Sequence, residues 1–275
     1  MRFTFLIENK TDNPGIVAEH GLSIYIEAQG KKILFDAGET DLFAVNAKKL
    51  KIDLADVDFG VISHGHSDHT GGFPTFGRIN SHAPIYVHKN AFRVSYGMED
   101  GKIEEESSGI AWTDEQLKEL APRLLFTDGP QWIGENICIT GTVKHAAGFA
   151  PTENFYYKEK DEFVVDDMSH EQCLVIREPE GIYIFSGCSH RGVISALEMG
   201  QAMFPGEKVA ALIAGMHLYS TSDVNRARVV DEIVGAGIDR VMPVHGTGIK
   251  AICDLKSRMG DSCIVATAGD TFYGC

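Results

Sequence analysis

The sequence lacks the features that mark a membrane protein or a secreted disulfide scaffold. No apolar run reaches the roughly 18 residues that a membrane span requires, and the opening stretch MRFTFLIENKTDN has no hydrophobic region of the signal-peptide kind. The 6 cysteines are scattered over 275 residues without a C-x-x-C pair, so a disulfide framework is not expected. We therefore expect a cytoplasmic protein that does not contact a membrane.

Positive charge is also scarce. Lys and Arg number 25 against 39 Asp and Glu, which gives a formal net charge of −14. A field of this sign repels a phosphate backbone and argues against a nucleic-acid-binding protein, although a local pocket can still accept one small anion. With 44% hydrophobic residues, the chain can bury a substantial core.

No internal repeat or low-complexity linker divides the chain, and we expect a single domain over residues 1–275. Strand-like segments dominate the first part, and strands alternate with helices in the second. The expected strands cover residues 2–8, 22–28, 31–38, 57–63, 172–178, 181–187, 208–215 and 239–244, and the expected helices cover residues 40–52, about 192–204, 222–237 and 249–260. This order favours two sheets packed together with helices outside.

Two expectations are more local. The acidic segment at about 90–130 is expected to be an insertion with one short helix that begins at the cap Thr113, and we favour a solvated excursion over a lid that covers substrate. The helix over 222–237 is expected to bury one apolar face, formed by Val224, Ala227, Val230 and Val234.

The most informative stretch is ISHGHSDHTGG, residues 62–72, which holds three histidines and an aspartate within six positions. An H-x-H-x-D-H pattern arises by chance in about one chain in a thousand of this composition. Extended residues two apart share a face, so His64 and His66 can reach one metal ion, while Asp68 and His69 can serve a second. Imidazoles and a carboxylate suit zinc, with iron or manganese as alternatives. The competing interpretation is a helix-entry turn that Asp68 caps, with the histidines on the surface.

Three later strand ends also carry a histidine. They read FSGCSH, IAGMH and PVHG, and their histidines are His190, His217 and His245. Open α/β sheets bind ligands beyond the carboxyl ends of their strands, so these side chains are candidates for the same site.

Together these motifs resemble those of the metallo-β-lactamase-fold superfamily of metallohydrolases. The resemblance covers nearly the whole chain and rests on ILFDAG, with Asp36 and Gly38, on VDFGVISHGHSDHTGG, on IYIFSGCSH and on VMPVHGTG. It implies an α/β fold, an αββα sandwich of two mixed β-sheets with helices on the outer faces, and one or two metal ions at the edge between the sheets. Diiron redox relatives place Glu where this chain has His66, so the resemblance points to hydrolase-type members.

The resemblance also implies a ligand set, with Asp36 orienting a ligand histidine. The ligands carried over are His64, His66, Asp68, His69 and His245. Cys188 stands where the superfamily usually has a bridging Asp, and its thiol can bind zinc or be buried and inert. For a further ligand we favour His190, at a strand end, over His145, the nearest candidate by order for a histidine that the superfamily usually carries.

The expected chemistry is hydrolysis of a small ester-like or phosphate-bearing molecule. A zinc ion lowers the pKa of a bound water towards about 7, which supplies hydroxide at neutral pH. Asp68 can carry a proton to the leaving group, and His217 is a candidate for proton transfer or substrate contact. His20 is a candidate substrate contact, because the resembling subgroup carries a stretch similar to AEHGLS. Two zinc ions and an anionic small-molecule substrate are expected, and assembly as a homo-oligomer is left open.

Two alternatives stay open. The arrangement GCSHRG, GMHL and HGTG resembles a subgroup related to a dihydropterin-dependent aminobenzene ribosyl phosphate synthase, so the same centre can belong to a transferase that releases pyrophosphate. The other alternative is a non-catalytic metal-binding or sensor protein, against which an open coordination site argues. β-Lactam hydrolysis is not expected, and no G-x-S-x-G elbow, P-loop or Rossmann fingerprint supports a different chemistry.

Overall fold

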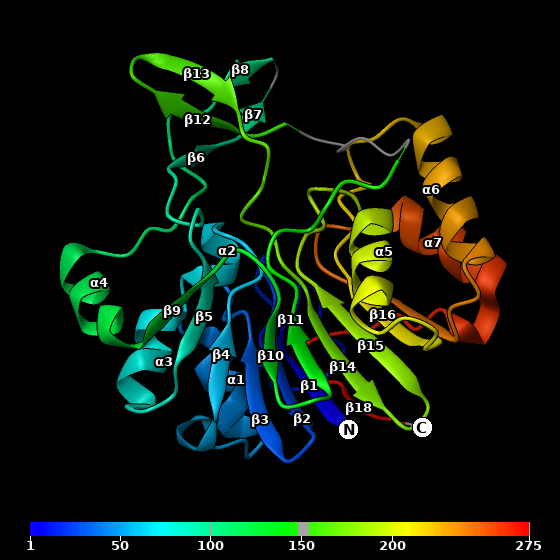
Figure 1. Ribbon diagram of the computed structural model, residues 1–275, viewed down its shortest axis with the longest axis horizontal. Coiled ribbons are helices and arrows are strands. Elements are labelled where there is room, and N and C mark those ends of the chain that lie inside the picture. Colours follow the sequence, from blue (N-terminus) through cyan, green and yellow to red (C-terminus); the bar gives the residue numbers. More distant parts are fainter. Residues whose placement is uncertain (100, 148–153, 275) are drawn as a thin grey trace. The chain divides into compact units, whose positions relative to one another are not determined.

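The computed structural model describes residues 1–99, 101–147 and 154–274 (Figure 1). The chain forms two compact units, each assembled from segments that are distant in the sequence. The first unit comprises Met1–Asp128, Asn154–Glu171 and Thr267–Tyr273, and the second comprises Gly129–Glu153, Gln172–Ala266 and Gly274–Cys275. The single-domain organisation stays a prediction.

The first unit contains a seven-stranded mixed sheet with the order β18-β1-β2-β3-β4-β5-β9. β1 pairs antiparallel with β18 and β2, β2 pairs antiparallel with β3, and β3, β4, β5 and β9 run parallel. The strands are β1 (Arg2–Ile7), β2 (Ser23–Ala28), β3 (Lys31–Phe35), β4 (Phe59–Val61), β5 (Ile85–His88), β9 (Leu124–Thr127) and β18 (Thr271–Tyr273).

Helices of the first unit bury aromatic side chains against this sheet. Phe43 of α1 and Phe73 and Phe76 of α3 share one apolar cluster with Leu34 of β3 and Ile85 of β5. The helices are α1 (Leu42–Lys49), α2 (Ser67–Thr70), α3 (Phe73–Ile79) and α4 (Asp114–Leu120), with 3-10 turns at Leu54–Asp56 and Ala121–Arg123.

The acidic insertion is more structured than predicted. Its helix α4 begins at the expected cap, where the Thr113 side chain accepts a hydrogen bond from Gln116 N and the Gln116 side chain accepts one from Thr113 N. The insertion also contributes strands, which the sequence analysis did not predict. β6 (Ser95–Tyr96) joins β12 (Tyr156–Glu159) and β13 (Glu162–Val165) in the order β13-β12-β6, and β7 (Met98–Glu99) pairs with β8 (Lys102–Ile103), at the top of Figure 1.

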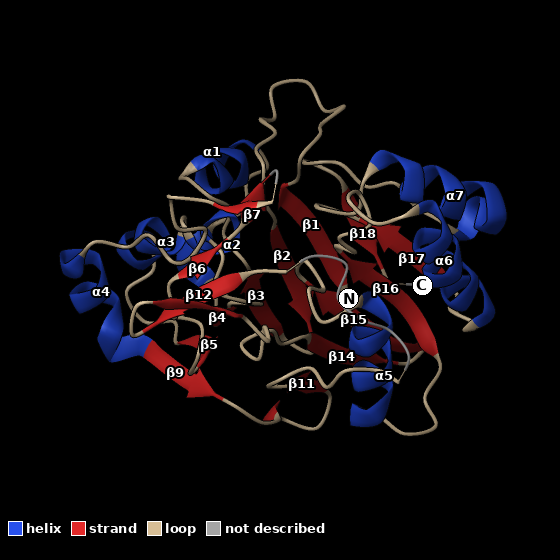
Figure 2. Ribbon diagram, turned by 90° about the horizontal axis from the view of Figure 1, so that it is seen from above, coloured by secondary structure: helices blue, strands red, loops and turns tan. Residues whose placement is uncertain are grey.

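The second unit contains a six-stranded mixed sheet with the order β10-β11-β14-β15-β16-β17. The pairs from β10 to β15 are antiparallel, whereas β15, β16 and β17 run parallel. Helix α6 packs beside α7 (Figure 2). The elements are β10 (Gln131–Ile133), β11 (Ile137–Ile139), β14 (Leu174–Glu178), β15 (Gly181–Ser186), α5 (Val193–Met203), β16 (Val209–Ala214), α6 (Asp223–Gly235), β17 (Arg240–Pro243), α7 (Ile249–Met259) and a 3-10 turn at Gly260–Ser262.

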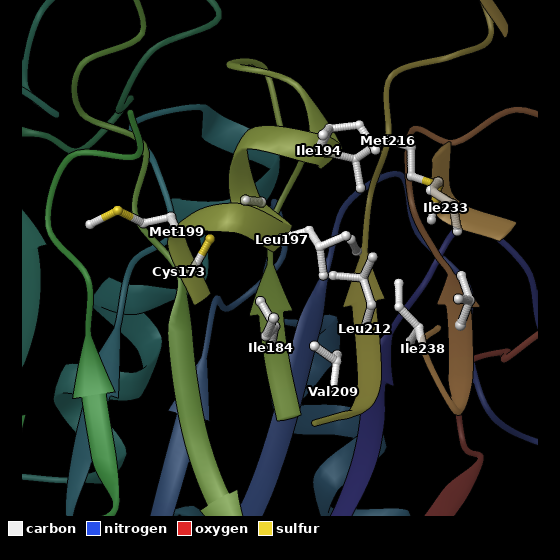
Figure 3. Packing of buried hydrophobic residues seen from close by; sticks show 14 of the residues in the cluster. Cys173, Ile184, Ile194, Leu197, Met199, Val209, Leu212, Met216, Ile233 and Ile238 are labelled. Carbon is white, nitrogen blue, oxygen red and sulfur yellow. The ribbon is translucent and has the colours of Figure 1, made fainter. Parts of the chain in front are cut away.

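The core of the second unit lies between these helices and the sheet. Figure 3 shows Leu197 of α5 beside Leu212 of β16, with Ile184 of β15 and Ile233 nearby. The four side chains belong to one buried apolar cluster. β15, β16 and β17, whose carboxyl ends lead to candidate site residues, all contribute side chains to this core.

The predicted apolar face of α6 was wrong in its first half. Val224 is 81% exposed, and Ala227 is exposed as well. The buried residues are Val229, Val230 and Ile233. Val224 and Ala227 therefore lie outside the apolar stripe that α6 buries.

Among the described residues, no helix has the length and apolarity that crossing a bilayer would need.

We predict that Leu212→Ala lowers the free energy of unfolding by about 2–5 kcal/mol, because it leaves a cavity in a fully buried core position. Leu117→Ala on α4 is the matched control, since Leu117 is 37% exposed and alanine is a good helix former, and its loss should stay below about 1 kcal/mol. Urea unfolding followed by circular dichroism measures both. Equal losses would contradict this account of the core.

Candidate metal centre

Two neighbouring parallel strands of the first unit bring Asp36 and Ser63 together. β3 ends at Phe35 and β4 at Val61, and these two residues are partners in the parallel register. Asp36 N donates to Val61 O at 2.9 Å, which places Asp36 at the same sheet edge as the segment that follows β4. Asp36 adopts a φ of 55°, an uncommon conformation for a residue other than glycine. Strain of this kind concentrates at functional sites.

The buried Asp36 carboxylate accepts three hydrogen bonds. Its Oδ1 accepts from Ser63 N at 2.7 Å, and its Oδ2 accepts from Ser63 Oγ at 2.7 Å and from His69 Nδ1 at 2.7 Å. Burial raises the pKa of Asp36, while charge on His69 and the hydrogen bonds from His69 and Ser63 oppose that rise. All three bonds require the carboxylate as acceptor. The network therefore favours an ionised Asp36 that accepts all three hydrogen bonds.

This network fixes the tautomers of two histidines. Because His69 Nδ1 donates to Asp36, the lone pair of a neutral His69 ring lies on Nε2. Ser63 Oγ gives its only proton to Asp36, so it can only accept from His64 Nδ1, which lies 2.9 Å away. The lone pair of neutral His64 is thereby also placed on Nε2. The Ser63 hydroxyl, because it donates to Asp36, thus sets the tautomer of His64.

The three histidines of the motif form one buried group. The ring of His64 lies 4.6 Å from that of His66 and 4.3 Å from that of His69, measured between centroids. All three residues are buried. The surface-histidine interpretation of this motif is therefore wrong. Their ring spacing is the kind that ligands of a shared ion need, although coordination itself stays a prediction.

Asp68 lies at the exposed side of this group. Its Oδ2 is 3.7 Å from His69 Nε2 and 3.4 Å from His20 Nε2. The side chain of His20 is 70% exposed, so it faces Asp68 from the solvent side. Gly21 permits this approach: an added Cβ would lie 2.2 Å from Asp68 O, and the φ of Gly21 is 137°. The contact brings His20 beside the motif, and its role towards substrate stays a prediction.

His170 supports the backbone of the motif. It is buried, and its Nδ1 accepts a hydrogen bond from Gly65 N at 3.1 Å. The other ring nitrogen, Nε2, lies 3.6 Å from Asp166 Oδ2. Burial acts to raise the pKa of Asp166, but the hydrogen bond and charge of His170 and the bond from Met168 N outweigh it and lower that pKa. An ionised Asp166 therefore favours the His170 tautomer with its proton on Nε2. This tautomer leaves Nδ1 to accept the hydrogen bond from Gly65 N.

In the second unit, the ends of three parallel strands gather the other candidates. Cys188 and His190 follow β15, His217 follows β16, and His245 follows β17. Of their donor atoms, Cys188 Sγ lies within 4.8 Å of a ring nitrogen of His245 and within 4.8 Å of one of His190. The rings of His190 and His217 are 4.3 Å apart. The structure therefore brings together the histidines of the three strand ends, and their part in one site stays a prediction.

Burial separates the two candidates for the further ligand. His190 is buried next to His217, whereas His145 is an exposed residue between Lys144 and Ala146. Cys188 is 1% exposed, which suits either an inert thiol or a shielded ligand. The geometry of the second unit favours His190, and the choice stays a prediction.

The donor set of each unit fits a divalent metal ion. The first unit offers imidazoles whose lone pair lies on Nε2 at His64 and His69, beside the carboxylate of Asp68. The second offers a thiol and imidazoles within a small volume. Nitrogen, sulfur and carboxylate oxygen are the ligands that zinc prefers in proteins.

Comparison with known sequences agrees with this chemistry. A sequence profile described as the metallo-β-lactamase superfamily matches residues 17–165, more than half of the 275 residues. The chain belongs to the metallo-β-lactamase superfamily. The predicted resemblance is confirmed, and the fold is the metallo-β-lactamase fold, with mixed sheets and helices.

Two relatives in the superfamily are similar to nearly the whole chain. One is the 7,8-dihydropterin-6-methyl-4-(β-D-ribofuranosyl)-aminobenzene-5′-phosphate synthase of Methanocaldococcus jannaschii, 30% identical over 249 residues, which cover 85% of this chain and 83% of the relative. The other is the crystal structure of Tm1679, a metal-dependent hydrolase of the β-lactamase superfamily. It matches with a TM-score of 0.85 and 29% identity over 99% of this chain and 98% of that one. Zn²⁺-bound PqqB from Methylobacterium extorquens shares the fold, with a TM-score of 0.62, 11% identity and coverage of 99% and 100%.

Several residues around the superfamily's motif were missed by sequence reasoning. Ser63 directly precedes His64, and its position after a buried strand was a signal that could have been followed. Phe155 packs its ring 4.4 Å from that of His66, and His170 contacts Gly65. Neither is close to the motif in sequence, so no local pattern could have indicated them.

We predict that Ser63→Ala weakens metal binding by about 10- to 100-fold, the usual cost of losing a group that orients a ligand. The change removes the acceptor of His64 Nδ1 and one donor to Asp36. Competition with a colorimetric chelator measures the affinity. Ser81→Ala, at an exposed serine of the same unit, is the control and should bind metal like the wild type. Unchanged affinity in Ser63→Ala would contradict the tautomer argument.

A separate prediction concerns His88, which is buried. Burial lowers the pKa of His88 from 6.5 to about 4, and the charges of His170 and Lys89 add to the shift. Between these two pH values the unfolded chain binds a proton that the folded chain does not. His88 therefore reduces folding stability as pH falls from about 6.5 to about 4, by up to roughly 3 kcal/mol.

His88→Asn should flatten this acid slope, because the asparagine Oδ1 can replace His88 Nδ1 as acceptor for Asn90 N. Urea unfolding at a series of pH values between 7 and 4 measures the difference. The control His82→Asn changes an exposed histidine and should keep the slope of the wild type. If His88→Asn and the wild type lose stability in parallel, the assignment fails.

Proposed function

We propose that this chain is a metal-dependent hydrolase that acts on a small ester-like or phosphate-bearing molecule. The observation that carries the proposal is the buried Asp36–Ser63 network, which presents the Nε2 lone pairs of His64 and His69. A protein seldom buries such a network without a ligand that uses it. Similarity over nearly the full length to a metal-dependent hydrolase supports the reaction class.

The proposed ligand set is the one that superfamily membership implies. The proposed ligands are His64, His66, Asp68, His69, His190 and His245, with zinc as the native metal and two ions per chain. A bound zinc ion supplies Lewis acidity and makes water a usable nucleophile near neutral pH. We further propose a cytoplasmic location for the protein.

The chain's own residues have distinct tasks in this proposal. Asp36 keeps His64 and His69 in the ligand tautomer. Asp68, at the exposed side of the histidine group, moves a proton towards the leaving group, and His20 on its solvent side helps to bind an anionic substrate. His217 contacts the substrate or transfers a proton from the second unit.

A transferase is the second candidate, and a specific finding favours it. The relative from Methanocaldococcus jannaschii is a synthase, and the match covers more than four-fifths of both chains. In this version the amino nitrogen of an aminobenzene ribosyl phosphate attacks the methylene carbon of a dihydropterin-methyl diphosphate. The new C–N bond forms as the C–O bond to pyrophosphate breaks, and the amine gives up a proton. The two reactions can use the same donors, so the product must decide between them.

The first test of the metal centre is metal content per chain. We expect about two equivalents of zinc in the wild type, a fall of about one equivalent in His190→Ala, and no change in His145→Ala. Elemental mass spectrometry on proteins purified in parallel gives the numbers. A loss in His145→Ala instead would assign the ligand to His145, and less than a tenth of an equivalent after reconstitution would overturn both enzyme candidates.

The reaction class is tested with the zinc-loaded protein and two assays. Release of p-nitrophenol from bis(p-nitrophenyl) phosphate measures hydrolysis, and release of pyrophosphate from a dihydropterin diphosphate, with and without the aminobenzene ribosyl phosphate, measures transfer. We expect hydrolysis that is lost in Asp68→Asn. Pyrophosphate release that requires the aminobenzene substrate would replace the hydrolase by the transferase.

A further inference from the structure

Three rings form a row at the strand ends of the second unit. The centroid of His190 lies 4.3 Å from that of His217, and the centroid of His217 lies 5.3 Å from that of Tyr219. Exposure rises along the row, because His190 and His217 are buried at 3% and 8% exposed and Tyr219 is 57% exposed. The row thus leads from the candidate ligands to the surface of the unit.

The position of Tyr219 is fixed by the backbone around it. His217 adopts a φ of 44°, which turns the chain sharply after β16. Gly248 lies against the other side: a Cβ added there would come within 2.6 Å of Tyr219 Cβ and 2.8 Å of its Cα, and the φ of Gly248 is 86°. The last glycine of HGTG, Gly248, is therefore needed to seat Tyr219.

Exposed apolar residues stand in the first turns of the helices that follow Tyr219 and Gly248 in the chain. Ile249, directly after Gly248, is 80% exposed, and Val224 at the start of α6 is 81% exposed. Both begin helices that pack beside each other in the second unit. Tyr219 thus lies beside a candidate site histidine, and its exposed ring is accessible to a ligand.

We propose that Tyr219 is a specificity residue that stacks on a planar aromatic ring of the substrate, next to His217. The inference rests on the proposed function and deepens it, since it names an aryl-bearing phosphate as the substrate class. A stacked or edge-on ring contact adds affinity beyond the area that it buries, and an aliphatic ring of the same size cannot reproduce it. Tyr219 positions the ring, and the reacting phosphate lies with the metal ligands.

The test compares phenyl phosphate with cyclohexyl phosphate, which differ in planarity and share the charged group. Isothermal titration of the zinc-loaded protein should show phenyl phosphate binding about 2- to 10-fold more tightly. Tyr219→Phe should keep this preference, and Tyr219→Leu should abolish it while the zinc content stays unchanged. Tyr273→Leu is the matched control, because Tyr273 is an exposed tyrosine of the first unit and is 68% exposed.

Equal affinities of the two phosphates for the wild type, or a preference that survives in Tyr219→Leu, would overturn the inference. If neither phosphate binds, the proposed phosphate substrate fails, and the ring contact is then decided with neutral probes. Saturation-transfer NMR with benzyl alcohol and cyclohexylmethanol should still favour the aromatic alcohol in the wild type and in Tyr219→Phe, and not in Tyr219→Leu. Equal signals from both alcohols would reject the aromatic subsite by itself.

Discussion

The buried carboxylate of Asp36 is the constraint on which the first unit's candidate centre depends. A charged group without solvent is costly unless donors surround it, and here Ser63 N, Ser63 Oγ and His69 Nδ1 supply three. Because Ser63 Oγ and His69 Nδ1 donate their protons to this carboxylate, the lone pairs of neutral His64 and His69 lie on Nε2. The same hydrogen bonds therefore stabilise the buried carboxylate and orient the histidines, so a substitution that removes one of them affects both.

The second unit reaches a comparable result by different means. Its donors follow three adjacent parallel strands, so the sheet register alone brings Cys188, His190 and His245 near one another. Backbone crowding replaces the hydrogen-bond network: at Gly215, an added Cβ would meet Gly187 O and His245 O at 2.4 Å. Since the β15, β16 and β17 ends are packed this tightly, their side chains have little freedom to leave the group.

The sequence was most informative where function follows from local order. The H-x-H-x-D-H motif and the three strand-end histidines could be predicted because each lies directly after an apolar strand, and parallel strands share an edge. His170 and Phe155 could not be predicted, because they reach the motif through β12 and β13, which pair with β6 some sixty residues earlier in the chain. The face of α6 failed for a related reason: periodicity indicates a stripe, but only packing decides which turn lies over the sheet.

Superfamily membership leaves the substrate undetermined, and the structure suggests why. A hydrolase and a synthase are both similar to this chain over most of its length. Membership of the superfamily therefore does not by itself decide between hydrolysis and transfer. The metal ligands determine which kind of bond the metal can polarise, whereas the residues around them determine which substrate binds. Tyr219 is such a residue, because its backbone packs against Gly248, its ring lies beside that of His217, and it is more than half exposed. Selectivity among members of the superfamily is therefore better sought in the loops after the strands than in the ligands themselves.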